Sequence, residues 1–504
     1  MGPVSGLREK VKLAMSERDG QLLWQNIVRL TNKSDHECIR SLRVALLIWL
    51  QSPGSPWLRQ LYRFLRSNRT LLPMRRVAFP AAQHGQFVFC FAANVPSSIK
   101  PILPVVSEAD HRGLLGGIVA PYIFPELKQF VGRVPIVTPQ LLISRLNLAE
   151  RIGVASEALC VFKEISRMLA GYHAPYAVRL RKNFGVALEE ITTSLQMARA
   201  FQELFNVWKP SCVISAGDFW PFPYQFVYQA SSLKIPSVLI QHGVSDFFWY
   251  PFVADLYCLW GDADVEEMRR FGAPAEKLAA VGMPAMDEIF RQGETVQSEP
   301  VRNGRQPVCL ILSNTHGSNF EPSVFEDYSQ FFTEAVKSMP SITWKIKLHP
   351  AEDDSFYRKM GTSIFERLVF HPKETSLPEA VADADVITTI YSTAGLEAMI
   401  MNRPLIVAPL SPRVREIAPW PATGGGVYAS SAEDFRSQFS KLVSDQDYKS
   451  RQMERQTSFL ASHFANRGHA AERIVDLLEQ YKYQVPLCSV EHAASGALGA
   501  ARGV

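Results

Sequence analysis

The residues around His242 combine a proton-carrying side chain with a predicted strand end. His242 and its neighbour Gln241 follow the apolar run 236–240, and Gly243 comes next. A short apolar run predicts a buried strand, and ligands of open parallel sheets bind beyond the carboxyl ends of the strands. An imidazole at that place can act as an acid, as a base or as a hydrogen-bond donor to a phosphate. A histidine that merely ends a strand, with a glycine in the following turn, is the structural alternative.

His349 has the same kind of setting in the second half of the chain. Along residues 344–349, apolar and basic side chains alternate, and Pro350 ends the predicted strand just after His349. Lys347 is the nearest basic residue before it. Basic groups at the mouth of such a sheet suit a phosphate or pyrophosphate. The alternative is a solvated strand end.

A third candidate site lies in residues 385–399, where an apolar run leads into a turn and a predicted helix. Ser392 and Thr393 fit the start of that helix, where hydroxyls stand beside free backbone N–H groups and the positive helix end. This is the chemistry of an anion site, and the small Gly395 would let a ligand approach the backbone. Glu397 lies one turn further and could accept hydrogen bonds from ribose hydroxyls. An ordinary capping serine is the alternative.

Asp218 follows another apolar run, residues 212–215, and is flanked by aromatic residues. A carboxylate in this position can remove a proton from an acceptor hydroxyl, and the aromatic rings can stack on a sugar. The alternative is an aspartate that caps the next helix.

The elements that must position these residues fall into two series of strands alternating with helices. This order predicts two parallel sheets with right-handed crossovers, an α/β fold. The first series of predicted strands comprises residues 86–93, 117–120, 134–138, 212–215, 237–241 and 256–260. The second comprises residues 308–313, 343–348, 368–370, 386–389, 405–408 and 426–428.

The two series divide the chain into regions. Residues 1–80 are predicted to be a helical extension and residues 81–295 a first Rossmann-like domain. A polar linker leads to a second Rossmann-like domain over residues 300–445. One C-terminal helix follows over residues 446–485, and the Ala-, Gly- and Ser-rich residues 486–504 are predicted to be disordered. A chain of 504 residues is too long for one core, so two domains are the natural division.

Composition excludes several classes of protein. Apolar residues make up 47% and charged residues 20%, and the formal charge of +4 gives no reason to expect a nucleic-acid partner. The seven cysteines have no CxxC spacing, which argues against a zinc site or disulfide framework and for a reducing compartment. The N-terminus has no signal-peptide pattern, so a cytoplasmic location is expected.

One segment stands out by its charge. Residues 39–106 contain no Asp or Glu, but they contain eight arginines and one lysine, several interleaved with aromatic residues at helical spacing around Trp57 and Tyr62. A basic amphipathic helix of this kind can lie on an anionic membrane surface, here the cytoplasmic face of an inner membrane. The alternative is a helix that packs on the domain and exposes a basic face to water.

Taken together, the motifs resemble those of bacterial GT-B transferases that act on CMP-, CDP- or UDP-activated donors. The most similar groups are CDP-glycerol glycerophosphotransferases, capsule polysialyltransferases and β-Kdo transferases. The resemblance covers residues 205–410 and rests on Gln241-His242-Gly243, Lys347-Leu348-His349-Pro350 and the run from Ser392 to Glu397.

This resemblance implies two Rossmann-like domains facing a cleft and assigns roles to the candidates. His349, Ser392 and Thr393 would hold the donor phosphate, and His242 would lie near the donor or the reaction centre. Asp218 is our candidate base, because the acidic motif of polysialyltransferases has no clear counterpart here. The expected catalytic residues are Asp218, His242 and His349; the expected donor-binding residues are Gln241, Gly243, Lys347, Ser392, Thr393, Gly395 and Glu397. No DxD motif follows a strand, so we expect neither a metal nor a cofactor.

The expected activity is a glycosyl transfer from a nucleotide-sugar to a growing polysaccharide or glycolipid, such as capsule or lipopolysaccharide. Glycerol phosphate or a sugar phosphate could be moved in the same way. Two alternatives remain open: a UDP-N-acetylglucosamine 2-epimerase-like enzyme, which needs no acceptor, and a non-catalytic GT-B module in capsule assembly.

Overall fold

A computed structural model of the chain defines the fold. It describes residues 25–32, 39, 40, 42, 43, 46, 80, 81, 85–92, 99–144, 146–172, 174–217, 221–243, 249–295, 305–313, 322–349, 352–390, 392, 394–408 and 420–484.

The N-terminal domain is built on a parallel sheet of seven strands in the order β3-β2-β1-β4-β5-β6-β7. Every neighbouring pair in it is parallel. The central strands are buried along their whole length, which is why their sequences are nearly continuous apolar runs. The strands are β1 (Phe87–Cys90), β2 (Leu115–Val119), β3 (Ile136–Val137), β4 (Cys212–Ser215), β5 (Ser237–Ile240), β6 (Leu256–Leu259) and β7 (Leu278–Ala280).

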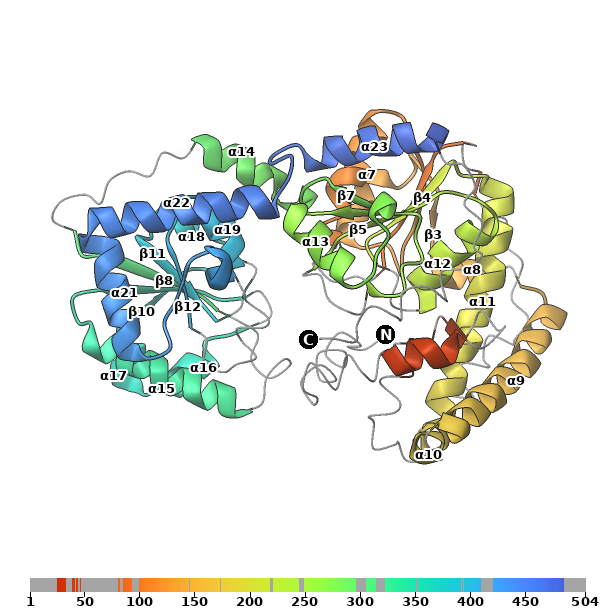
Figure 1. Cartoon of the computed structure of the whole chain (residues 1–504), viewed down its shortest axis with the longest axis horizontal. Coiled ribbons are helices and arrows are strands. Elements are labelled where there is room, and N and C mark those ends of the chain that lie inside the picture. The colour runs from red at the N-terminus through yellow and green to blue at the C-terminus, as the bar shows by residue number, and fades with distance from the viewer. Residues whose placement is uncertain are drawn as a thin grey trace. The chain divides into compact units, whose positions relative to one another are not determined.

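Helices cover both faces of this sheet. On one face, α7 (Leu103–His111) and α23 (Ala470–Gln484) share a hydrophobic core with alternate residues of β1, β4, β5 and β6. Figure 1 shows α23 beside α7, although they come from opposite ends of the chain. On the other face, α12 (Pro221–Ser232) packs on β4 and β5, and Trp208 of α11 (Phe184–Trp208) packs on β2.

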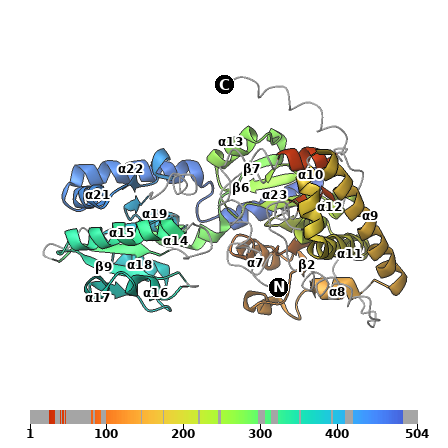
Figure 2. The same cartoon turned by 90° about the horizontal axis from the view of Figure 1, so that it is seen from below.

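A group of long helices extends this domain. After α8 (Pro139–Ser144), α9 (Leu148–Tyr172) and α10 (Ala174–Lys182) lead to α11, and these last three helices pack on one another. Figures 1 and 2 show that α9, α10 and the first half of α11 lie beyond the edge of the sheet.

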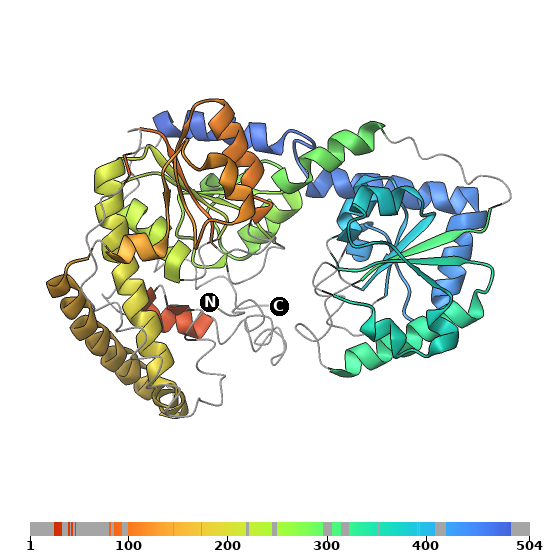
Figure 3. The same ribbon diagram turned by 180° about the vertical axis from the view of Figure 1, so that it is seen from behind.

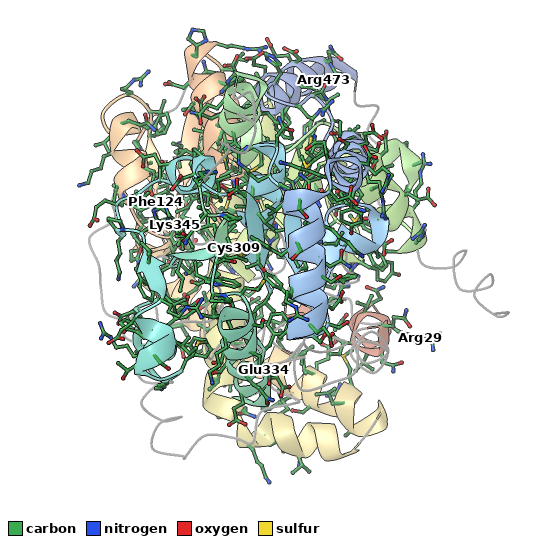
Figure 4. All side chains as sticks on the ribbon, turned by 90° about the vertical axis from the view of Figure 1, so that its left-hand side faces the viewer. Arg29, Phe124, Cys309, Glu334, Lys345 and Arg473 are labelled. Carbon is green, nitrogen blue, oxygen red and sulfur yellow. The ribbon has the colours of Figure 1, made fainter. Side chains whose placement is uncertain are left out.

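The C-terminal domain has a parallel sheet of six strands in the order β10-β9-β8-β11-β12-β13. All five strand pairs are parallel. Figure 4 labels Cys309 and Lys345, which belong to the neighbouring strands β8 and β9. The strands are β8 (Val308–Leu312), β9 (Thr343–Lys347), β10 (Leu368–Phe370), β11 (Val386–Thr389), β12 (Leu405–Val407) and β13 (Val427–Tyr428).

This second sheet is also covered on both faces, as the view from behind shows (Figure 3). On one side, Trp344 lies between Phe332 of α15 (Pro322–Ser338) and Phe435 of α21 (Ala432–Ser444), with ring centroids 5.4 and 5.9 Å apart. α19 (Ala394–Ile400) packs on β11 and β12 and contacts both α18 (Leu377–Ala382) and α22 (Gln446–His463).

The chain passes between the two compact units twice. Among the described residues, those within Met286–Gly468 form one unit, and those before and after them belong to the other. The predicted helix 446–485 is therefore two helices: α22 stays with the C-terminal domain, and α23 returns to the N-terminal domain. The division after Ala285 also places α14 (Asp287–Thr295) with the C-terminal domain instead of the first domain predicted over 81–295.

The predicted strands agree with the observed ones to within a few residues. Residues 212–215, 368–370 and 386–389 match β4, β10 and β11 at both ends. The sequence interpretation missed β7, whose three residues are only half-buried and follow a short 3-10 helix. A strand this short leaves little periodicity to detect.

The structure describes only part of the basic N-terminal segment. Residues around Trp57 and Tyr62 lie outside the described ranges. Arg43 is buried; its guanidinium donates hydrogen bonds to Thr31 Oγ1 and Asn32 Oδ1, at 2.8 and 2.5 Å. Within the described parts, no helix has the length and hydrophobicity needed to cross a bilayer. Four cysteines of described strands are buried free thiols, and Cys160 on α9 is exposed.

Gly117 gives a test of how tightly α11 packs on the first sheet. A Cβ at Gly117 would lie 2.5 Å from Trp208 Cζ3, so Gly117→Ala requires a shift of a fully buried ring. We expect this variant to lower the free energy of unfolding by about 1–3 kcal/mol, measured by urea denaturation. Gly171→Ala in α9 is the control, because its Cβ would meet nothing within 4 Å; unchanged or higher stability is expected there. Equal losses in both variants would contradict this packing.

Candidate functional site

The C-terminal sheet changes direction between two of its central strands. From β8 the chain runs outward to β9 and β10, and then returns to place β11 on the other side of β8. This is a topological switch point, where crossover loops diverge and leave a crevice beyond the carboxyl ends of the strands. Ser313, His349 and Ser392 follow β8, β9 and β11, the three strands at this point.

A closed ring of hydrogen bonds holds the loop that carries His349. The backbone N–H of His349 donates to Ser313 Oγ at 2.8 Å, and Ser313 Oγ–H donates to Glu352 Oε2 at 2.5 Å. The backbone N–H of Glu352 then donates to the carbonyl oxygen of His349 at 2.9 Å. Ser313 and Glu352 are buried, whereas His349 is exposed. The ring therefore fixes the backbone of His349 and leaves its side chain accessible.

A second chain of bonds holds Ser392. Thr389 Oγ1 donates to the carbonyl oxygen of Leu312 at 3.0 Å and accepts from the backbone N–H of Ser392 at 3.2 Å. Ser392 Oγ in turn accepts from the N–H of Ala394, at 3.3 Å, at the start of α19. Ser392 thus bonds to the first residue of α19, close to the predicted start of this helix.

Both chains of bonds begin at the end of β8. Leu312 holds the loop of Ser392, and the next residue, Ser313, holds the loop of His349. Because β9 and β11 flank β8 in one parallel sheet, their carboxyl-end loops lie at the same edge. The structure therefore places His349 and Ser392 at one edge of the sheet, after the two strands that flank β8.

Buried tyrosines lie beneath the ring. Tyr357 and Tyr328 are almost completely buried, and their neighbour Phe356 stacks on Tyr328 with ring centroids 5.8 Å apart. Burial, then the neighbouring Tyr328 and Glu352, raises the pKa of Tyr357 well above its ordinary value. Burial also raises the pKa of Tyr328. Both phenols therefore stay neutral at physiological pH. They lie buried beside the ring that holds the loop of His349.

Three other predicted donor-binding residues, Lys347, Gly395 and Glu397, lie among the described residues. Lys347 Nζ donates to the carbonyl oxygen of Lys373 at 3.0 Å, which joins β9 to the loop after β10. A Cβ at Gly395 would lie 3.2 Å from Leu405 and 3.3 Å from Thr389, so Gly395 serves the packing of α19 on the sheet. The predicted approach of a ligand to the backbone at Gly395 remains a prediction. Glu397 lies half-buried within α19.

The N-terminal sheet has its own switch point, between β1 and β4. Gly217, just after β4, shows how close the loops are: a Cβ there would lie 3.7 Å from Ala92 Cβ and 3.6 Å from His242 Cε1. The carboxyl ends of β1, β4 and β5 thus meet at this point. His242 is half-buried and lies beside Trp249, with ring centroids 5.7 Å apart.

Gln241 is an internal link in this loop. Its side chain is fully buried, donates to Gly243 O and Asp264 Oδ1, and accepts from the N–H of Trp260 at 2.8 Å. These bonds tie the end of β5 to the end of β6 and to α13 (Asp262–Arg270). The described contacts of Gln241 therefore position His242; its predicted contact with a donor remains a prediction.

Two predicted site residues, Asp218 and Thr393, lie outside the described residues. Among the residues that the structure describes, no three His, Cys, Asp or Glu side chains gather as ligands of a metal ion would.

Sequence reasoning missed the residues that hold the site together. Ser313 was only the last residue of the predicted strand 308–313, and no role was predicted for Glu352. The spacing between them in the sequence carries no periodic signal. One sign was available: a serine ends the apolar run 308–313, and a glutamate follows the His-Pro pair by two positions.

Comparison with protein-family models and with curated protein sequences gave no match. Solved structures are similar in fold. A UDP-N-acetylglucosamine 2-epimerase is 15% identical over 80% of this chain and 97% of its own, with a TM-score of 0.50. A Listeria monocytogenes protein assigned as such an epimerase is 13% identical over 79% and 97%, with a TM-score of 0.51. The calicheamicin glycosyltransferase CalG4 is 13% identical over 80% and 99%, with a TM-score of 0.47. The fold is thus the predicted α/β fold with two Rossmann-like domains of the GT-B type.

Removing the hydroxyl of Ser313 tests the ring. Ser313→Ala leaves a buried carboxylate of Glu352 and the N–H of His349 without this partner, so we expect a loss of about 1–3 kcal/mol in unfolding free energy. Ser338→Ala removes a single local bond at the end of α15 and should change stability by less than about 0.5 kcal/mol. Urea denaturation measures both, and equal stability of the Ser313 variant and the unchanged protein would refute the role of the ring.

Proposed function

We propose that the protein transfers a sugar, or a sugar-like group, from a nucleotide-activated donor to a glycan or glycolipid acceptor. One observation carries the proposal: loops bearing His349 and Ser392 are both anchored to the end of β8, at the switch point of the C-terminal sheet. An exposed imidazole and a hydroxyl in one crevice are groups suited to a phosphate-containing ligand.

The C-terminal domain would bind the donor nucleotide. His349 would donate a hydrogen bond to a phosphate oxygen and stabilise the negative charge that develops on the leaving nucleotide. Ser392 would donate to the same group. Because α19 has only seven residues, we assign this contact to side chains rather than to a helix dipole. Charge stabilisation by such groups would allow transfer without a metal ion.

The N-terminal domain would act on the acceptor. His242 stands at the junction of three strand ends, supported by the buried side chain of Gln241. Asp218 follows β4 in the sequence, one residue after Gly217, and is the candidate general base. Deprotonation of an acceptor hydroxyl by one of these groups would generate the nucleophile that attacks the donor.

Alanine at His349 tests the donor site. We expect His349→Ala to lower the rate of transfer about 10²–10³-fold, because one charge-stabilising donor is lost in the transition state. His111→Ala is the matched control, because His111 is an exposed residue at the end of α7. Its rate should equal that of the unchanged protein.

A nucleotide screen identifies the donor class first. Thermal-shift measurements with CMP, CDP, UDP and GDP should show stabilisation by at least one of them, and His349→Ala should reduce that shift. No stabilisation by any nucleotide, confirmed by calorimetry, would favour a non-catalytic module. Near-normal transfer by His349→Ala would remove His349 from the mechanism.

An epimerase is the second candidate, because two of the similar structures carry that name. An epimerase converts UDP-N-acetylglucosamine with no acceptor present, whereas a transferase does not. Incubation with that sugar nucleotide alone, followed by NMR of the sugar, separates the two. Appearance of the 2-epimer would replace the transferase proposal.

A further inference from the structure

The far end of the α9–α10–α11 group combines positive charge with exposed apolar side chains. Residues 165–188 contain no Asp or Glu, yet they include Arg167, Arg179, Arg181 and Lys182. The segment spans the end of α9, all of α10 and the start of α11. Figures 1 and 3 show α10 at the end of these helices, away from the sheet of its domain.

Apolar side chains are exposed among these charges. Val178 is 50% exposed on α10, and Phe184 is 37% exposed at the start of α11. Phe184 is held in place edge-on against Phe162 of α9, with ring centroids 4.8 Å apart. We call Arg167, Val178, Arg181, Lys182 and Phe184 the helical tip; all five side chains are exposed.

The outer face of α9 continues this surface. Ile152, Leu159, Lys163 and Arg167 are exposed, and their spacing places them on one face of the helix. Lys163, Arg167 and Arg181 form no ion pair with another described residue. The nearest acid before the tip, Glu164, is half-buried. Among the described residues, the charges of Arg167 and Arg181 are therefore exposed and not neutralised by an ion pair.

We propose that the helical tip docks on an anionic lipid bilayer. Arginine and lysine side chains attract acidic headgroups, while their alkyl stems and the aliphatic and aromatic neighbours enter the interface. Single exposed apolar residues are common on proteins and need no explanation. Their placement inside an acid-free, basic helical end is what distinguishes this surface. A nucleic acid would neutralise the same charges but would gain nothing from Val178 and Leu159.

The helical tip lies outside the proposed donor site. If the membrane proposal proves wrong, the proposed transfer reaction is therefore not affected. The experiment is sedimentation of the full chain with two kinds of vesicle. One consists of phosphatidylcholine alone, and the other of phosphatidylcholine with about 40% of the anionic lipid phosphatidylglycerol. We expect binding to the anionic vesicles only, weakened by high salt because exposed charges are screened.

Charge reversal locates the binding surface. Arg167→Glu/Arg181→Glu should lower the partition coefficient at least about tenfold, since each basic residue near the bilayer adds to the attraction. Arg269→Glu/Arg473→Glu changes the charge equally on α13 and α23 and should bind as the unchanged protein does. Figure 4 labels Arg473, and Figure 1 shows α23 on the side of this domain away from α10. Circular dichroism checks that both variants fold.

A probe on the outer part of α9, next to the tip, tests insertion directly. An environment-sensitive dye on Cys160, the exposed thiol of α9, should shift its emission to the blue with anionic vesicles, after Cys38 and Cys488 are changed to serine. Equal binding by both charge-reversal variants would place the membrane contact elsewhere and overturn the proposal. Absence of vesicle binding, or binding to RNA with no vesicle binding, would overturn it as well.

Discussion

The candidate site depends on two consecutive residues at the end of β8. Leu312 offers a backbone carbonyl to Thr389, and Ser313 offers a hydroxyl to the backbone of His349. These bonds point to opposite sides of one strand and hold the loops of its two neighbours. Loss of the Ser313 hydroxyl would therefore disturb the backbone of His349, because the ring through Glu352 would lose one of its hydrogen-bonding groups.

The fold explains why the chemistry-bearing residues lie at strand ends. In a parallel sheet the interior of each strand is buried by helices on both faces, so it can carry few polar groups. At a switch point the crossover connections diverge, so the carboxyl ends of the strands there are not covered and can carry polar groups. Both domains follow this rule: the second at β8 and β11, and the first at β1 and β4, where Ala92, Gly217 and His242 meet.

Buried and exposed residues of the site have different roles. Burial raises the pKa of the phenols of Tyr328 and Tyr357, so both stay neutral at physiological pH. His349, in the neighbouring loop, is exposed. The same contrast separates Gln241, which is buried and hydrogen-bonded on both sides of its amide, from His242 beside it.

The sequence by itself determined the fold class, most strands and the ends of strands where the candidates stand. A short apolar run predicts a strand that is buried on both faces of a sheet, and residues 386–389 form such a strand. The tertiary structure alone decided which candidates share a crevice and what each small or polar residue does. Gly395 and Lys347 were predicted to serve a ligand; the structure adds that Gly395 leaves room for Leu405 and Thr389, and that Lys347 bonds the loop after β10, contacts that no sequence pattern shows. Ser313 and Glu352 could not be paired in advance, since a hydrogen bond across 39 positions leaves no periodic trace in the chain. The return of α23 to the first domain was hidden for the same reason: its amphipathic pattern specifies that it packs, and only the folded chain specifies on which sheet.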